Sequence, residues 1–221
     1  MSGARRSAGS GAPRGLSFSS REFRDLALAW LALGVAFAVF FAGGGQEAVS
    51  RIQQGGVLAP LVLSLLTAGF GFLFHEVAHK VVAVRFGQVA EFRADYGMLF
   101  LAVVSALAGF IFAAPGAVHH RGRLSAREHG LIALAGPATN ALLAVVFAPV
   151  FVVGVSAGSE FLALAGARGL TINLFLAAFN MLPFGSLDGN TVLGWSKVVF
   201  AAFFVPVALL TVGAFAIGFG F

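Results

Sequence analysis

The residues best suited to chemistry are five consecutive ones, His75-Glu76-Val77-Ala78-His79, near the end of an apolar stretch over residues 57–84. On a helix, positions four apart lie on one face about one turn apart, so His75 and His79 can bind one metal ion. Glu76 would then flank the open coordination position. This pattern predicts the metal site of a zinc hydrolase, and its apolar setting predicts that the site lies within a lipid bilayer.

A tetrahedral zinc site needs a third protein ligand, and a chain without cysteine must supply it as nitrogen or oxygen. Asp188 is the best placed of the three aspartates, because it follows Pro183 at the end of an expected span. Proline removes a backbone donor and breaks the helix, so the next loop can turn Asp188 towards the histidines. Asp95 is an alternative third ligand, but it lies at no expected helix end. Three further histidines stand among arginines and are interpreted as interfacial surface residues: His119, His120 and His129.

The composition indicates an integral membrane protein. Hydrophobic residues make up 59% of the chain and charged residues only 10%, and the mean hydropathy is +0.94, far from the soluble globular average. The net charge of +5 could indicate nucleic-acid binding, but the basic residues gather at the ends of apolar segments, as positive-inside bias places them. We therefore expect a lipid bilayer, and no nucleic acid, as a partner.

The apolar segments predict an all-α polytopic membrane protein, a bundle of about five to six transmembrane helices in a single domain over residues 26–221. The expected spans lie at residues 26–42, 57–84, 130–153 and 168–182, with one or two more in residues 192–221. Residues 1–25 are rich in Ser, Gly and Arg and predict a disordered tail. The arginines of this tail place the N-terminus of a multi-pass cell-membrane protein in the cytoplasm.

The segment between the second and third clear spans needs a different interpretation. Residues 88–98 mix polar and apolar side chains and predict a short β-hairpin at the interface. His79 and Asp188 each lie at the end of a span, so their helices must run in the same direction, with an odd number of crossings between them. Residues 99–114 are therefore expected to be re-entrant or packed at the interface, while residues 130–153 make the crossing.

Three motifs stand in order along the chain: His75-Glu76-x-x-His79, Gly136-Pro137-Ala138-Thr139-Asn140 and Asn180-x-x-Pro183-x-x-x-x-Asp188-Gly189. Together they resemble the site-2 protease family of intramembrane zinc metalloproteases, in a compact form without PDZ or CBS domains. The resemblance implies one Zn²⁺ per chain, with His75, His79 and Asp188 as its ligands. It also implies that Glu76 is the catalytic base.

The same resemblance implies a substrate class. An enzyme of this family would hydrolyse peptide bonds of single-span membrane proteins near the cytoplasmic face, and Asn140 and Asn180 would line the substrate path. A second interpretation of these two asparagines is that they hold neighbouring helices together by hydrogen bonds, as polar residues in membrane bundles often do.

Two other functions are kept as alternatives. A metal-ion transporter could use the histidines and the aspartate as a transit site, but such sites usually lie near the membrane midplane between repeated halves, and the chain shows no internal repeat. A prenyl-protein type membrane metalloprotease takes its third ligand from a distant glutamate. Here the glutamates after His79 all lie outside the apolar cores of the expected spans: Glu91, Glu128 and Glu160.

Overall fold

The computed structural model describes residues 15–54, 56–112 and 115–219. Its elements follow the chain in this order: α1 (Ser20–Phe41), α2 (Gly45–Gln53), α3 (Leu58–Ser64), the π-helical turn η1 (Leu65–Gly69), α4 (Phe70–Arg85), β1 (Val89–Ala94), α5 (Tyr96–Leu107), β2 (Gly116–Arg121), α6 (Ala126–Ser156), α7 (Glu160–Asn180), α8 (Asp188–Trp195) and α9 (Lys197–Ala216). In the described part of the chain, all regular secondary structure is helical apart from one two-stranded sheet.

Five helical segments are long and apolar enough to cross a membrane: Ser20–Phe41, Leu58–Arg85, Ala126–Ser156, Glu160–Asn180 and Lys197–Ala216. These five confirm the all-α polytopic bundle. The second segment joins α3, η1 and α4 into one continuous helix. After Asp188 the described chain forms the short helix α8 and a single long helix, α9, so it contributes one span there rather than two.

The first helix begins earlier than the sequence led us to expect. The hydroxyl of Ser19 accepts a hydrogen bond from the N–H of Glu22 and caps the helix at Ser20, as serine does at many helix starts. Residues 20–25, which we assigned to the disordered tail, are therefore helical. The arginine-rich composition of this region obscured its capping signal. Residues 1–14 of the predicted tail lie outside the described residues.

The acidic residues of this first turn are buried against strand β1. The Glu22 carboxylate accepts a hydrogen bond from the backbone N–H of Phe92, and Asp25 accepts one from Ala94. Glu22 also forms an ion pair with Lys80 of α4, and both side chains are almost completely buried. These contacts anchor α1 to the sheet and to the helix that carries the candidate metal ligands.

The span that we expected over residues 168–182 also begins earlier, at Glu160. Ser159 caps α7 by accepting a hydrogen bond from the N–H of Leu162. Arg168 consequently lies inside the span, where its guanidinium carbon is 4.4 Å from the ring centroid of Phe41. A cation held over an aromatic face in this way is stabilised electrostatically. Because α7 begins at Glu160, Arg168 does not mark the start of the helix.

The predicted hairpin is wrong in its second strand. Within residues 88–98 only β1 forms, because Asp95 accepts a hydrogen bond from the N–H of Met98 and starts α5 instead. The partner strand is β2, which carries part of the basic run and pairs antiparallel with β1. In this pairing Ala94 lies opposite Gly116.

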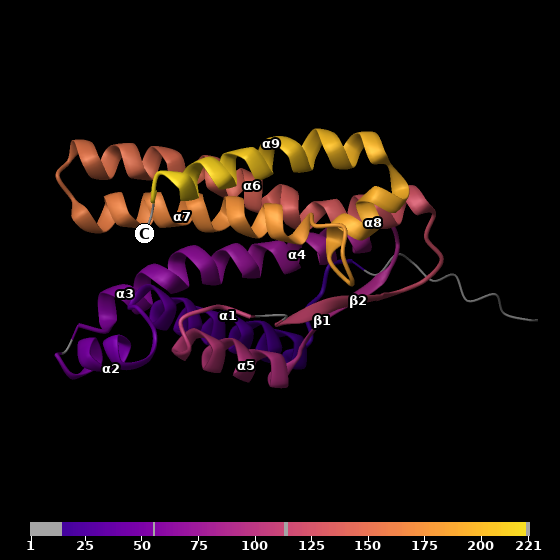
Figure 1. Ribbon diagram of the computed structural model, residues 1–221. Helices are drawn as coiled ribbons and strands as arrows, with labels where there is room; N and C mark the ends of the chain where they lie inside the picture. The colour runs from indigo at the N-terminus through magenta and orange to yellow at the C-terminus, as the bar shows by residue number, and fades with distance from the viewer. Residues whose placement is uncertain (1–14, 55, 113–114, 220–221) are drawn as a thin grey trace, which may run out of the picture.

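The segment between the two strands leaves the sheet and returns to it. Helix α5 is too short to cross a membrane, and the chain after it runs back to the strand partner of Ala94 (Figure 1). The hydroxyl of Ser105 accepts a hydrogen bond from the N–H of Phe112 and holds this returning chain against α5. The N–H of Asp95 donates a hydrogen bond of 3.0 Å to the oxygen of Pro115. The two ends of the excursion therefore meet, as expected for a non-crossing segment.

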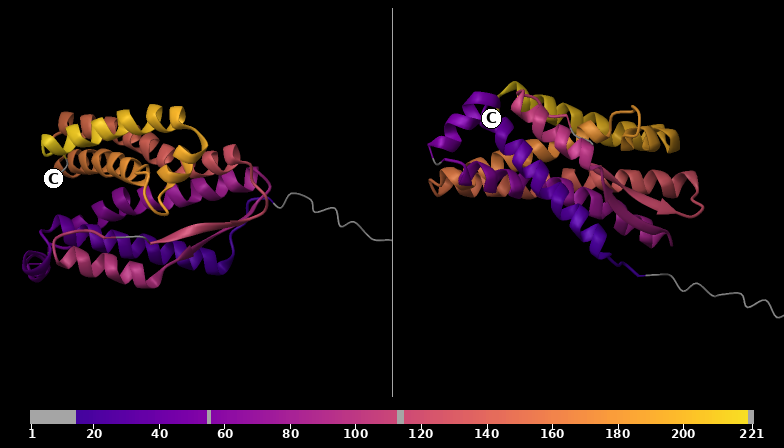
Figure 2. Two further views of the ribbon diagram at one scale, coloured as in Figure 1. Left: turned by 45° about the vertical axis from the view of Figure 1, so that its right-hand side comes forward. Right: turned by 90° about the horizontal axis from the view of Figure 1, so that it is seen from below.

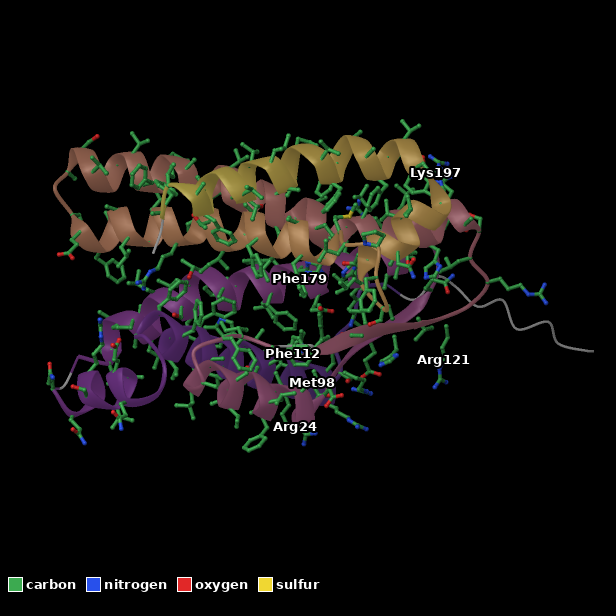
Figure 3. The ribbon with its side chains drawn as sticks, in the orientation of Figure 1. Arg24, Met98, Phe112, Arg121, Phe179 and Lys197 are labelled. Atoms are coloured by element: carbon green, nitrogen blue, oxygen red, sulfur yellow. The ribbon has the colours of Figure 1, made fainter. Side chains whose placement is uncertain are left out.

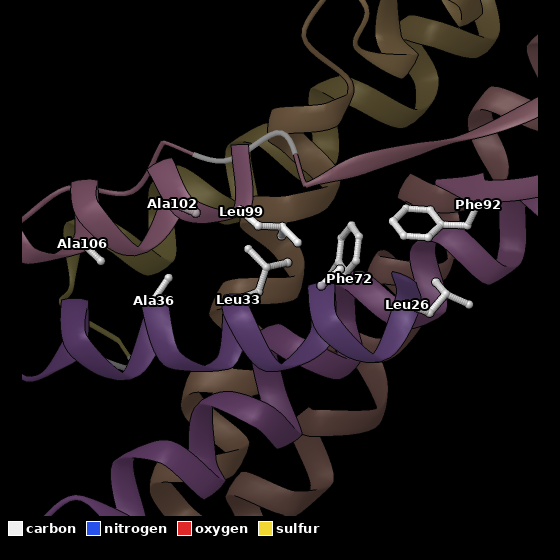
Figure 4. Close-up of a cluster of buried hydrophobic side chains, with 9 residues drawn as sticks. Leu26, Leu33, Ala36, Phe72, Phe92, Leu99, Ala102 and Ala106 are labelled. Carbon is white, nitrogen blue, oxygen red and sulfur yellow. The ribbon is translucent and has the colours of Figure 1, made fainter. Parts of the chain in front are cut away.

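The long helices pack as two layers. Helices α6, α7 and α9 form one layer, and α1 and α5 lie on the far side of α4 (Figures 1 and 2). Figure 4 shows the apolar cluster that joins α1 to α5, with Leu33 and Ala36 facing Leu99 and Ala102. Helix α4 is thereby held between the layers, with α6 on one side of it.

Helices α6 and α7 form an antiparallel pair that depends on glycine. A Cβ atom on Gly166 would lie 2.1 Å from the backbone nitrogen of Phe151, and one on Gly154 would lie 2.2 Å from that of Ala163. Small residues let helix backbones approach closely in membrane bundles. The glycines thus allow α6 and α7 to pack closely. Helix α7 runs in the same direction as α4, and α6 runs the opposite way (Figure 1).

Candidate metal centre

The structure brings His75, His79 and Asp188 together. Their ligand atoms all lie within 4.8 Å of one another. The two imidazole Nε2 atoms are 2.9 Å apart, and each lies 3.3 Å from Oδ2 of Asp188. Tetrahedral zinc with bonds of about 2.0–2.1 Å requires ligand atoms roughly 3.3–3.4 Å apart. The two distances to the carboxylate match this requirement, and the imidazoles need to separate by only a few tenths of an ångström.

Both histidines present Nε2 to this point because their other ring nitrogens are engaged by α6. Nδ1 of His79 lies 2.7 Å from the backbone oxygen of Ile132. Nδ1 of His75 lies 2.6 Å from Oδ1 of Asn140. Since both partners are acceptors, each Nδ1 carries the proton and each Nε2 is left with a lone pair for a metal.

Gly136 lies between these two partners on the same face of α6, because residues 132, 136 and 140 are four apart. A Cβ atom at Gly136 would lie 2.4 Å from Nε2 of His79 and 2.5 Å from Nε2 of His75. Any side chain there would occupy the space of the ligand atoms. The glycine therefore leaves α6 a cradle into which the two imidazoles fit.

A π-helical turn, η1, directly precedes α4. In η1 the carbonyl of Leu65 accepts a hydrogen bond of 3.1 Å from the indole nitrogen of Trp30 on α1. A Cβ atom on Gly69 would lie 2.8 Å from the indole ring, so the glycine admits it. Single π-helical turns inside α-helices are frequent near functional sites. Here the turn offsets the face of α4 that carries the histidines from the face of α3.

Asp188 reaches the site from a tight turn after α7. A Cβ atom on Gly189 would lie 2.0 Å from the backbone oxygen of Met181, so only glycine allows the chain to fold back this closely. The side chain of Asn190 donates a hydrogen bond of 3.1 Å to the oxygen of Gly185 within this turn. Oδ2 of Asp188 faces Nε2 of both histidines. Its carboxylate must be ionised to serve as a metal ligand.

Glu76 is buried next to His75 on α4, with 8% of its surface exposed. A buried carboxylate beside two candidate metal ligands is the arrangement in which a glutamate can exchange protons with a water at the metal. The alternative third ligand Asp95 caps α5 and does not belong to the group of candidate ligands. Within the described residues, His119 and His129 are not part of that group either.

The two asparagines of the predicted substrate path have different surroundings. Asn140 is completely buried, and its amide nitrogen donates hydrogen bonds of 2.9 Å to the oxygen of Gly71 and to Oδ1 of Asn173. Its contacts are therefore with His75 and with two neighbouring helices. Asn180 is partly buried at the end of α7 and donates to the oxygen of Leu176. A role of Asn180 in substrate binding stays a prediction.

Sequence reasoning missed Asn173 and the part that Gly136 plays. Asn173 lies in the middle of an apolar helix and is completely buried. A polar residue in such a position usually faces the interior of a membrane bundle, and this signal was present in the sequence. The contact of Gly136 with both imidazoles, in contrast, depends on how α6 crosses α4, which no local pattern indicates.

The chain is similar to two curated proteins. It is 38% identical over 192 residues to a protein of Methanocaldococcus jannaschii named a "putative zinc metalloprotease", and the match covers 86% of this chain and 92% of that protein. It is 32% identical over 152 residues to a Bacillus subtilis protein that bears the same description, covering 60% of this chain and 67% of that protein. No family model and no solved structure matches the chain.

Proposed function

This chain belongs to the zinc metalloprotease family of these two relatives, and on that premise we propose that it is an intramembrane zinc endopeptidase. Its substrates would be single-span membrane proteins, cut within the bilayer. The observation that carries this proposal is the place of the candidate ligands. His75 and His79 lie on the candidate membrane span Leu58–Arg85, and Asp188 follows the span Glu160–Asn180 by a short turn.

His75, His79 and Asp188 would hold the zinc ion, and their separations and the space left by Gly136 fit it. When bound, zinc supplies a water of lowered pKa and polarises a carbonyl group. Glu76 would accept the proton of the attacking water and deliver it to the amine that leaves the peptide. The buried carboxylate of Glu76 is therefore assigned as a proton carrier rather than as a ligand.

The substrate must reach the site with part of its backbone unwound, because a helical carbonyl is hydrogen-bonded and shielded. Asn180 stands at the end of α7, seven residues before the turn closes at Leu187. We assign it to hydrogen-bonding the loosened substrate backbone.

The site would lie near the cytoplasmic face of the cell membrane. Lys80 and Arg85 follow the histidines on α4, and positive-inside bias places such residues in the cytoplasm. Arg121 and Lys197 lie at the end of the bundle towards which α4 and α7 run (Figure 3). The N-terminus of α1 would be on this side as well, since α1 runs opposite to α4 (Figure 1).

A metal-ion transporter would also use the three candidate ligands, but it would give the buried Glu76 no task. A prenyl-protein type protease would use a glutamate as its third ligand, whereas the third member of the group here is Asp188.

The test is a cleavage assay with purified protein in detergent, using a panel of single-span membrane proteins. We expect cleavage that stops with a zinc chelator and returns with added zinc, and no cleavage by Glu76→Gln. Chelator-resistant cleavage, or full activity of Glu76→Gln, would overturn the proposal.

A further inference from the structure

Two buried asparagines link α7 to the candidate ligand His75 through α6. We propose that Asn173 and Asn140 form a relay of hydrogen bonds that fixes the tautomer and ring orientation of His75 and thereby sets the affinity for zinc. The inference rests on the proposed zinc site and assigns Asn140 to the metal rather than to the substrate.

The relay begins at a backbone carbonyl oxygen, which can only accept a hydrogen bond. The carbonyl oxygen of Gly169 accepts a hydrogen bond of 2.8 Å from Nδ2 of Asn173. This contact directs Oδ1 of Asn173 towards α6, where it accepts a hydrogen bond of 2.9 Å from Nδ2 of Asn140. The orientation of the Asn173 amide is thus determined by the backbone of its own helix.

The second step transfers this orientation to the ligand. Nδ2 of Asn140 donates to Asn173 and also to the oxygen of Gly71, so its two hydrogens are both used. Oδ1 of Asn140 must then face Nδ1 of His75, at 2.6 Å, and only a protonated Nδ1 can donate to it. The Nε2 atom of His75 is consequently left unprotonated for the metal, as hydrogen-bond partners of metal-binding histidines commonly arrange.

The surroundings make this arrangement costly to disturb. Both asparagines are completely buried, and a buried polar group without a partner costs about 1–3 kcal/mol. A Cβ atom on Gly71 would lie 2.7 Å from Oδ1 of Asn173. Gly71, one helical turn before His75, therefore leaves the space in which the relay meets α4.

His79 provides an internal comparison. Its Nδ1 is held by the backbone oxygen of Ile132, which no substitution of a side chain removes. Of the two histidines, only His75 depends on another side chain, that of Asn140, for its orientation. Changes in the relay should therefore weaken the metal site without abolishing it, whereas removal of a ligand abolishes it.

The experiment measures zinc affinity by competition with a chromophoric chelator, together with the visible absorption spectrum of the Co²⁺-loaded protein. The variants are Asn140→Ala, Asn140→Asp and Asn173→Ala. The matched control is Thr211→Val, which removes a buried side-chain hydrogen bond on α9 that does not contact the metal group. Thermal unfolding of the metal-free proteins shows how much each substitution affects folding alone.

We expect Asn140→Ala to bind zinc about 10–100-fold more weakly, the usual effect of removing a partner of a metal-binding histidine, and to change the Co²⁺ spectrum. Asn173→Ala should show a smaller loss, because it acts through Asn140. Asn140→Asp keeps an acceptor for His75 but loses both donors to Gly71 and Asn173, so its affinity should lie between those of the wild type and Asn140→Ala. Thr211→Val should bind zinc as the wild type does.

Unchanged zinc affinity and an unchanged Co²⁺ spectrum in Asn140→Ala would refute the relay, and an increase in KM alone would return Asn140 to the substrate path. If Thr211→Val lost as much zinc affinity as Asn140→Ala, the loss would reflect folding and the relay would also be refuted. Zinc binding that follows the expected order in a protein that cleaves no substrate would support the relay and contradict the proposed function.

Discussion

Nε2 of His79 lies 3.3 Å from Oδ2 of Asp188, although the two residues belong to different helices separated by α5, α6 and α7. This contact requires α4 and α7 to end on the same side, which the single antiparallel crossing by α6 achieves (Figure 1). The excursion through α5 adds no crossing, because it returns to the sheet at the strand partner of Ala94. The metal centre thus depends on the arrangement of the helices as much as on its ligands.

The assigned roles predict different defects for ligand and base. Alanine at His75, His79 or Asp188 should remove both zinc and proteolysis, whereas Glu76→Gln should keep one zinc per chain and lose proteolysis. Glutamine preserves the shape of glutamate but cannot accept a proton at neutral pH. Metal analysis of the four purified variants, alongside the cleavage assay, decides the matter. Loss of zinc from Glu76→Gln would make Glu76 a ligand instead.

The cradle in α6 predicts that Gly136→Ala loses zinc. The added methyl group would lie within 2.5 Å of both Nε2 atoms, so the imidazoles would have to move from the positions in which they face Asp188. Gly213→Ala on α9 is the matched control, since a Cβ atom there meets nothing within 4 Å. Metal content of the two purified variants tests this, and equal zinc in both would show that α6 does not confine the site.

The topology predicts the sides on which two arginines lie. Arg51 belongs to α2, at the opposite end of the α1 and α4 helices from Arg123, which follows β2. The native chain has no cysteine, so single substitutions report cleanly. In intact cells an impermeant thiol reagent should label Arg51→Cys and spare Arg123→Cys. The reverse pattern would place the metal centre at the outer face.

The buried ion pair between Glu22 and Lys80 predicts a non-additive effect on stability. Lys80→Met leaves the carboxylate of Glu22 buried without its partner, which costs about 3–5 kcal/mol. Adding Glu22→Gln removes that charge and keeps an acceptor for the N–H of Phe92, so the double variant should regain much of the loss. Thermal unfolding in detergent compares the two. A double variant as unstable as Lys80→Met would show that the unpaired charge of Glu22 does not cause the loss of stability.

Much of this architecture could be predicted from the sequence, because apolar length and charge placement are local properties. They predicted the membrane bundle and the non-crossing excursion, and the four-residue spacing predicted the pairing of His75 with His79. The starts of α1 and α7 were missed, since Ser19 and Ser159 stand in polar surroundings where a cap and a loop have similar composition.

The contacts that support the ligands could not be predicted in the same way. The approach of Gly136 to the imidazoles and the link from Asn173 to Asn140 depend on the distances and angles between helices that are remote in sequence. The partner of β1 was unpredictable for a similar reason. Asp95 starts a helix that postpones the second strand until β2.

Hydrolysis within the membrane would leave a cut at a defined position in the substrate. The purified protein and a single-span substrate would be reconstituted together in lipid vesicles, and the fragments identified by intact mass spectrometry. We expect a zinc-dependent cut inside the apolar span of the substrate, near its cytoplasmic end, and none with Glu76→Gln. A cut in the soluble part of the substrate, outside the apolar span, would contradict it.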